Sequence, residues 1–248
     1  MQDANGKPTP ADPKALGKDV DGKPFKKQWG YASVVGMLLH LSGIAFAVNQ
    51  AARFILDAKN SHVIAVKRIV KYLIETKDRG LVFKPSLDWK VDCYVYADFC
   101  GLWGSEDPND PIVAKFRTGY VIFLAGCVLL WKSSLQTETS VSTMMAEYVA
   151  LSTVMRDMLP LKRLVKSIAK VVTGDDNVKD TTKSNIFEDS NGGLAVATLL
   201  RITFQGKFFA VKLHFFREHV KTERNLQGEI NIHKVDTVNK LGDLPKDW

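Results

Sequence analysis

Apolar and polar side chains alternate through Val91-Asp92-Cys93-Tyr94-Val95-Tyr96-Ala97-Asp98. A period of two is typical of a β-strand with one buried face. The same period returns in residues 119–124 and 127–131, on either side of Ala125-Gly126, and predicts a hairpin. We therefore expect three antiparallel strands in the middle of the chain.

The pattern changes to a helical one after Ser142, where apolar residues recur at spacings of three and four as far as Ile168. The later elements are expected as a strand at 185–189, helices at 192–200 and 208–220, a strand at 229–235 and a turn at 241–246. This order, βββαβαβα, predicts an α/β fold with a five-stranded mixed sheet and flanking helices.

The N-terminal part has a different character. Residues 1–28 are rich in Gly, Pro, Asp and Lys and predict a disordered or extended lead-in. Helices are expected at 31–41 and 44–54, and from Ser61 through Leu73. We therefore divide the chain into the lead-in, a small helical segment at 29–86 and the α/β domain at 87–248.

The composition limits the class of protein and its partners. The 248 residues are 46% hydrophobic, enough to bury a core, and 34 Lys and Arg against 27 Asp and Glu give a net charge of +7. This charge favours nucleic acid as partner, with a merely basic soluble protein as the alternative. Three unpatterned cysteines favour a reducing, intracellular setting, in the cytoplasm or nucleus. No run of about 18 apolar residues predicts a membrane span.

Four acids stand where secondary structure can aim them at one point. Asp98 ends the first strand and Asp189 ends the fourth, although a strand-end cap and a helix N-cap are the simpler explanations of each. Glu147 falls inside the apolar arc of the long helix and so needs a cation, either a metal or a partner such as Arg117. Asp243, near the C-terminus, is the weakest candidate alone.

Carboxylates in this number favour hard divalent cations, Mg²⁺ with Mn²⁺ as an alternative, and phosphodiester hydrolysis. Glu188 alternates to the opposite face from Asp189, so we leave it out of the predicted site. The chain has no phosphate-binding loop, no nucleophile elbow and no zinc helix. The residues thus predict a metal-dependent nuclease.

Five motifs resemble the C-terminal part of copia-type retrotransposon polyproteins, in the order of that family. Tyr96-Ala97-Asp98 is similar to its Tyr-Ala-Asp-Ala-Asp-Trp strand, and Ala146-Glu147-Tyr148 to its Glu-Tyr helix. The other three are Arg117-Thr118-Gly119-Tyr120-Val121, Glu188-Asp189-Ser190-Asn191-Gly192-Gly193 and His214-Phe215-Phe216-Arg217-Glu218. Residues 31–38, 44–48 and 65–73 resemble the helical segment that joins reverse transcriptase to ribonuclease H.

The resemblance implies a ribonuclease H-like domain in which Asp98, Glu147, Asp189 and Asp243 bind two metal ions. Its implied activity is hydrolysis of the RNA strand of RNA–DNA hybrids. The polymerase aspartates are absent, which indicates a fragment of the polyprotein. Four features depart from the family: Ser42-Gly43 joins Ile44 directly, Phe116 and Ser190 are unusual residues at their positions, and the ending at 244–248 differs. Departures of this kind are typical of a decaying copy. The alternative is therefore an inactive remnant that only binds nucleic acid.

Overall fold

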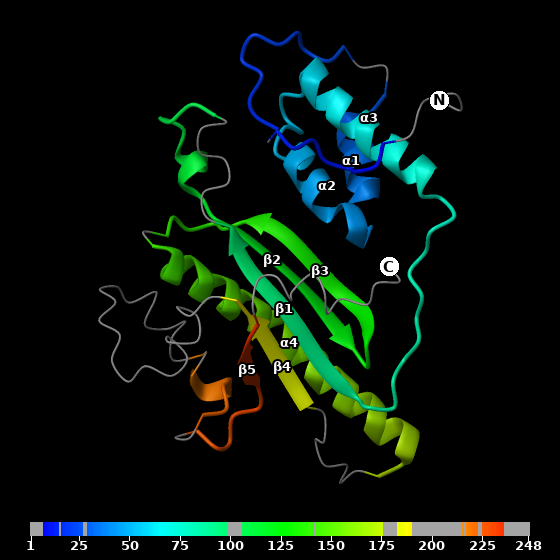
Figure 1. Ribbon diagram of the computed structural model, residues 1–248, viewed down its shortest axis with the longest axis vertical. Coiled ribbons are helices and arrows are strands. Elements are labelled where there is room, and N and C mark those ends of the chain that lie inside the picture. The colour runs from blue at the N-terminus through cyan, green and yellow to red at the C-terminus, as the bar shows by residue number, and fades with distance from the viewer. Residues whose placement is uncertain are drawn as a thin grey trace.

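The computed structural model describes residues 7–14, 16–26, 29–98, 106–140, 142–175, 183–189, 215, 217–222 and 225–235. A twisted sheet with one long helix across a face makes up the larger part. A unit of three helices lies beyond one end of that sheet (Figure 1). The chain thus places two separate hydrophobic clusters side by side, one in each part.

The helical unit comprises α1 (Tyr31–Leu38), a 3₁₀ turn (Ser42–Ile44), α2 (Ala45–Ala52) and α3 (Asn60–Glu75). Its centre consists of small and β-branched side chains that are almost fully buried: Val35, Val48, Ala51, Val66 and Ile69. Val66 and Ile69 are three residues apart on α3, which is the spacing that places two side chains on one helix face. The three helices expected in this region form, and α1 ends three residues earlier than its pattern predicts.

The sheet has the order β3-β2-β1-β4-β5. Its strands are β1 (Lys90–Asp98), β2 (Arg117–Leu124), β3 (Cys127–Leu135), β4 (Lys183–Glu188) and β5 (Asn231–Lys234). β1 pairs antiparallel with β2 and parallel with β4, and β4 pairs parallel with β5. The five-stranded mixed sheet with flanking helices is therefore confirmed.

The turn between β2 and β3 is the tight one that the sequence predicts. Ala125 and Gly126 both have positive φ, 51° and 83°. Two successive left-handed residues match the right-handed twist of a hairpin, and glycine takes this conformation without steric cost. The turn pairs Leu124 with Cys127, and a one-residue register shift between Ile122 and Phe123 then places Arg117 opposite Leu135 at the far end.

The helix α4 (Thr143–Thr173) covers one face of the sheet. Its N-cap Ser142 accepts a hydrogen bond from the Met145 N–H at 3.2 Å, and Gly174 ends it in the left-handed conformation with φ 67°. Its apolar side packs on every second residue of the strands, the set whose side chains face the helix. The side chains that meet there are Leu151, Val154, Met155, Met158, Val91, Cys93, Val95 and Ile186.

A buried cation joins the helical unit to the sheet. The Arg117 guanidinium, in a residue only 3% exposed, donates to Asn49 Oδ1 at 2.6 Å and to Ser133 Oγ at 3.4 Å. It also lies 5.2 Å from the centre of the Phe46 ring. Asn49 and Phe46 belong to α2, so Arg117 joins this helix to β2. The exact domain boundaries remain a prediction.

Candidate metal centre

The carboxyl ends of β1 and β4 meet at one edge of the sheet, because the two strands are parallel neighbours. Asp98 is the last residue of β1 and Glu188 the last of β4. Tyr94 pairs with Phe187, so Asp189 lies level with Tyr96. Asp98 lies two residues further along, a distance of about 6.6 Å at roughly 3.3 Å per residue.

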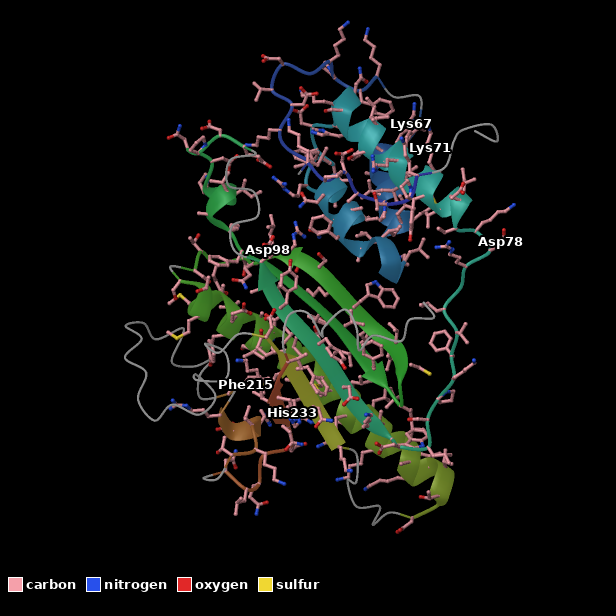
Figure 2. The ribbon with its side chains drawn as sticks, in the orientation of Figure 1. Lys67, Lys71, Asp78, Asp98, Phe215 and His233 are labelled. Carbon is pink, nitrogen blue, oxygen red and sulfur yellow. The ribbon has the colours of Figure 1, made fainter. Side chains whose placement is uncertain are left out.

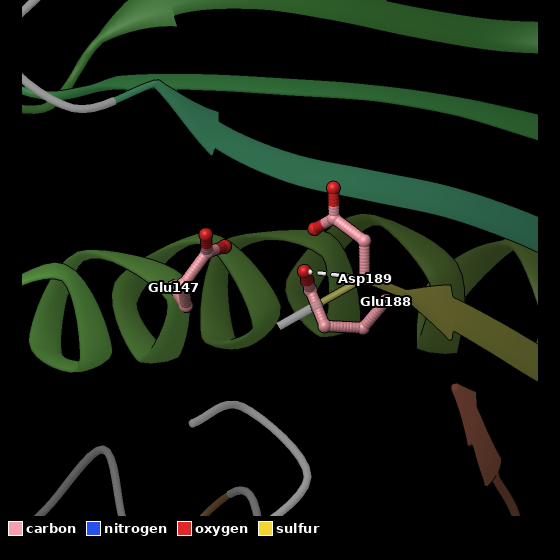
Figure 3. Close-up of side chains that lie close together, drawn as sticks. All are labelled: Glu147, Glu188 and Asp189. Atoms are coloured by element: carbon pink, nitrogen blue, oxygen red, sulfur yellow. Dashed lines mark hydrogen bonds between the residues drawn. The ribbon is translucent and has the colours of Figure 1, made fainter. Parts of the chain in front are cut away.

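Three carboxylates come together at this edge. Oxygens of Glu147, Glu188 and Asp189 all lie within 4.8 Å of one another (Figure 3). Glu147 comes from α4 and is 8% exposed, and Glu188 is fully buried. Buried acids at this separation repel one another unless a cation or protons lie between them. The group is therefore a candidate site for a positive ion.

Backbone amides orient two of these acids. The Ala97 N–H donates to Glu147 Oε2 at 3.1 Å, and the Asp189 N–H donates to Glu188 Oε1 at 3.0 Å. Hydrogen bonds of this kind favour the ionised form of a carboxylate. The first one also ties α4 to β1 one residue before Asp98. The same edge of the sheet thus carries Asp98 and the three clustered acids.

Asp98 is not a member of the close group, although it lies at the end of β1 (Figure 2), the strand next to β4. The charges of Asp98 and of two members of the group all affect the pKa of the Tyr96 hydroxyl. Burial raises the pKa of Tyr96 to about 12, the charge of Asp98 adds to the rise, Arg117 opposes it, and Glu147 and Asp189 add further. Asp98, Glu147 and Asp189 therefore all act on one hydroxyl group. Asp243 lies outside the described residues.

Glu188 corrects the sequence analysis. Alternation along β4 predicts opposite faces for Glu188 and Asp189, and for that reason the predicted site leaves Glu188 out, whereas the structure brings the two carboxylates into one group. Its side chain shares the face of Ser184 and Ile186, which α4 covers, and Glu147 reaches the same space from α4. Asp189 lies one residue past the strand, where strict alternation no longer separates the two side chains. The sequence did offer a signal: Glu188 is an acid at a strand end, and it belongs to the alternating positions of that strand that face the core.

The sequence left open an ion pair between Arg117 and Glu147, but Arg117 has other hydrogen-bond partners. It donates hydrogen bonds to Asn49 and Ser133, and it is the cross-strand partner of Asp98. Directly opposed residues project from the same face of a sheet. Burial lowers the pKa of Arg117, the charge of Arg53 lowers it further, and Tyr96 and Asp98 raise it. Arg117 thus supplies a fixed positive charge beside Asp98.

The donor set fits a hard divalent cation. All the converging ligand atoms are carboxylate oxygens, which Mg²⁺ and Mn²⁺ prefer over nitrogen or sulfur. The two buried members, Glu147 and Glu188, bring negative charge into a site where it needs compensation. Within the part of the chain that the structure describes, this is the one group of three acidic, histidine or cysteine ligands with such spacing.

Comparisons with known proteins agree with the motifs. The chain is 24% identical over 217 residues to a retrovirus-related Pol polyprotein from transposon RE1 of Arabidopsis thaliana, a match covering 86% of this chain and 13% of the polyprotein. It is 27% identical over 219 residues to that from transposon TNT 1-94 of Nicotiana tabacum, covering 86% and 15%. Homologues of the chain are therefore retrovirus-related Pol polyproteins of plant transposons. The resemblance drawn from the motifs is thus confirmed at the level of the family.

Other similarities extend over parts of the chain. The chain is 31% identical over 127 residues to secreted RxLR effector protein 161 of Plasmopara viticola. This match covers 49% of the chain and 84% of that protein, so the two proteins belong to one family. LC11-RNase H1, isolated from compost, aligns with a TM-score of 0.31 and 14% identity over 62% of this chain and 89% of its own. No protein-family model matches. The described helices include none long and apolar enough to cross a membrane.

Proposed function

We propose that this chain is a retrotransposon ribonuclease H domain of the copia type that hydrolyses the RNA strand of RNA–DNA hybrids with two divalent cations, Mg²⁺ or Mn²⁺. The observation that carries the proposal is the convergence of Glu147, Glu188 and Asp189 at the carboxyl ends of two parallel strands. Asp98 and the proposed ligand Asp243 complete the set. The chain spans 13–15% of the Pol polyproteins it matches, so their whole activity is not assigned to it.

The chain's own residues prepare the site in three ways. Glu147, Glu188 and Asp189 present oxygens to a common point, and the Ala97 and Asp189 amides hold two of them in place. Tyr96, with its pKa raised to about 12, stays protonated at neutral pH and offers a hydroxyl donor beside the acids. Divalent cations, when bound, would stabilise the charge of the phosphodiester and increase the acidity of the attacking water.

The test is a cleavage assay on the purified chain. We expect a labelled RNA–DNA hybrid to be cut in the RNA strand when Mg²⁺ or Mn²⁺ is present, and duplex DNA of the same sequence to remain intact. Glu147→Gln keeps the shape of the side chain but removes its charge, and it should abolish cleavage. Glu75→Gln, an exposed acid on α3, is the matched control and should cut normally. Metal-independent cleavage, or cleavage by Glu147→Gln, would contradict the proposal.

The second candidate is an inactive remnant that binds nucleic acid without cutting it. One observation favours it: Asp98 lies outside the close carboxylate group and has a buried guanidinium as its cross-strand neighbour. A fixed positive charge there competes with a metal ion for the same carboxylate. Hybrid binding without cleavage in either metal would select this candidate.

A further inference from the structure

A cavity of about 680 Å³ lies in the helical unit, between the segment 7–19 and helices α2 and α3. Its volume falls within the range of about 300–1,000 Å³ that is typical of ligand sites. One wall is the face of α3 that carries Ser61, Ile64, Arg68 and Lys71, a spacing of three and four residues that places them in a row. The opposite wall is the N-terminal segment.

Three side chains of the helical unit hold that segment against the helices. Arg68 donates to the Thr9 carbonyl at 3.2 Å and to Asp12 at 2.9 Å. The Leu16 carbonyl accepts from Arg53 at 3.2 Å, and the Gly17 carbonyl lies 3.1 Å from His62 Nε2. The wall is thus fixed in its first half by Arg68 of α3, and near its end by His62 of α3 together with Arg53, just after α2.

The lining is strongly cationic. Six basic side chains and two acidic ones line the cavity, an excess of four positive charges: Lys7, Lys14, Lys18, Lys67, Arg68, Lys71, Asp12 and Asp19. Two of the bases are engaged, because Arg68 pairs with Asp12 and Lys18 with Asp110. Within the described chain, Lys67 and Lys71 make no ion pair. They stand four residues apart on α3, near one another in Figure 2.

The floor connects this cavity to the end of the sheet. Phe46 lines the cavity and is 44% exposed, and its ring also lies under the Arg117 guanidinium at 5.2 Å. Arg117 is in turn the cross-strand partner of Asp98. Phe46 and Arg117 therefore connect the lining of this cavity, which includes Lys67 and Lys71, to the end of β1 at Asp98.

We propose that this cavity is a binding site for the phosphate backbone of nucleic acid, with Lys67 and Lys71 as its principal phosphate contacts. Free cations at one helical spacing suit successive phosphates, and the exposed Phe46 ring and the Ile64 side chain (68% exposed) offer apolar surface to sugar or base. The choice of an RNA–DNA hybrid as ligand rests on the proposed function. The phosphate site itself does not, because it needs neither metal nor cleavage.

The experiment measures binding of a fluorescein-labelled RNA–DNA hybrid by anisotropy, in EDTA so that no cleavage occurs, at several salt concentrations. Each phosphate contact contributes a slope of about 0.9 to log K against log salt, or roughly 8-fold in affinity at about 0.1 M salt. The double variant Lys67→Ala, Lys71→Ala should therefore lose up to about 60-fold in affinity, and its salt slope should fall by about 1.8.

Two controls separate charge from structure. Lys67→Arg, Lys71→Arg keeps both charges and should bind like the unchanged chain. Lys166→Ala, Lys170→Ala removes two lysines at the same spacing from the C-terminal half of α4, which points away from the helical unit in Figure 1, and should leave the slope unaltered. Unchanged affinity in the Lys67 and Lys71 alanine variant would overturn the site. So would tighter binding of a labelled poly-glutamate, which would indicate an acidic peptide as ligand.

The outcome is distinct from that of the proposed function. If the chain never cleaves the hybrid but the alanine variant still loses affinity and salt slope, the nuclease proposal fails and the phosphate site stands. If the chain cleaves the hybrid and the same variant binds it normally, the nuclease stands and the phosphate site is refuted.

Discussion

Replacing Glu188 by Gln should stabilise the metal-free protein, because Glu188 faces two other carboxylates within 4.8 Å. At that separation two like charges repel by about 3.5 kcal/mol with an effective dielectric constant near 20. Gln has the same shape, and its Oε1 can still accept the hydrogen bond from the Asp189 N–H. The substitution therefore removes repulsion without removing this contact.

The assay is thermal unfolding at pH 8, in EDTA and then in Mg²⁺. A gain of about 3 kcal/mol in a chain of this size raises the unfolding midpoint by roughly 6–12 °C. Added Mg²⁺ should raise the midpoint of the unchanged chain, since a ligand of the folded state stabilises it by mass action, and should raise that of Glu188→Gln by much less. The difference in midpoint between the two proteins should therefore shrink as metal is added.

Glu75→Gln is the control for the chemical change, because Glu75 is an exposed acid at the end of α3, and its midpoints should match those of the unchanged chain. Two results would refute the reasoning. One is a lower midpoint for Glu188→Gln in EDTA, which would show that the three carboxylates do not repel. The other is an equal Mg²⁺ response in both proteins, which would show that the group does not bind the ion.

Further predictions concern stability. Burial lowers the pKa of His62 below its ordinary 6.5, so the unfolded chain binds this proton before the folded chain does as the pH falls. The free energy of unfolding should therefore decrease below about pH 6.5. His62→Gln should flatten this part of a plot of that free energy, measured by urea unfolding, against pH. Met158→Ala empties a fully buried position and should cost about 2–5 kcal/mol by chemical denaturation, whereas Ile168→Ala, at a position 48% exposed, should cost far less. Ser142→Ala removes the cap of α4 and should lower the free energy of unfolding by about 1 kcal/mol, with Ser142→Asp, which can still cap, as the comparison.

The order of the elements could be predicted from the chain alone, because the periods that mark them are local. Strands β1 to β3 and helix α4 begin within two residues of their predicted starts. Glu147 was also predictable as an inward-facing acid, since a helix fixes the direction of each side chain relative to its neighbours. In the structure this residue is buried, 8% exposed, as its place in the apolar arc requires.

The membership of the acid group depended on contacts between residues far apart in the chain. Alternation along β4 predicts different faces for Glu188 and Asp189, but only the packing of α4 decided that the face of Glu188 is the one where Glu147 lies. The parallel register of β1 with β4 left Asp98 about two residues, or roughly 6.6 Å, beyond Asp189. Likewise, the docking of α2 brought Asn49 to Arg117 across 68 positions. Periodicity determines which way a side chain faces, whereas register and packing determine what it meets.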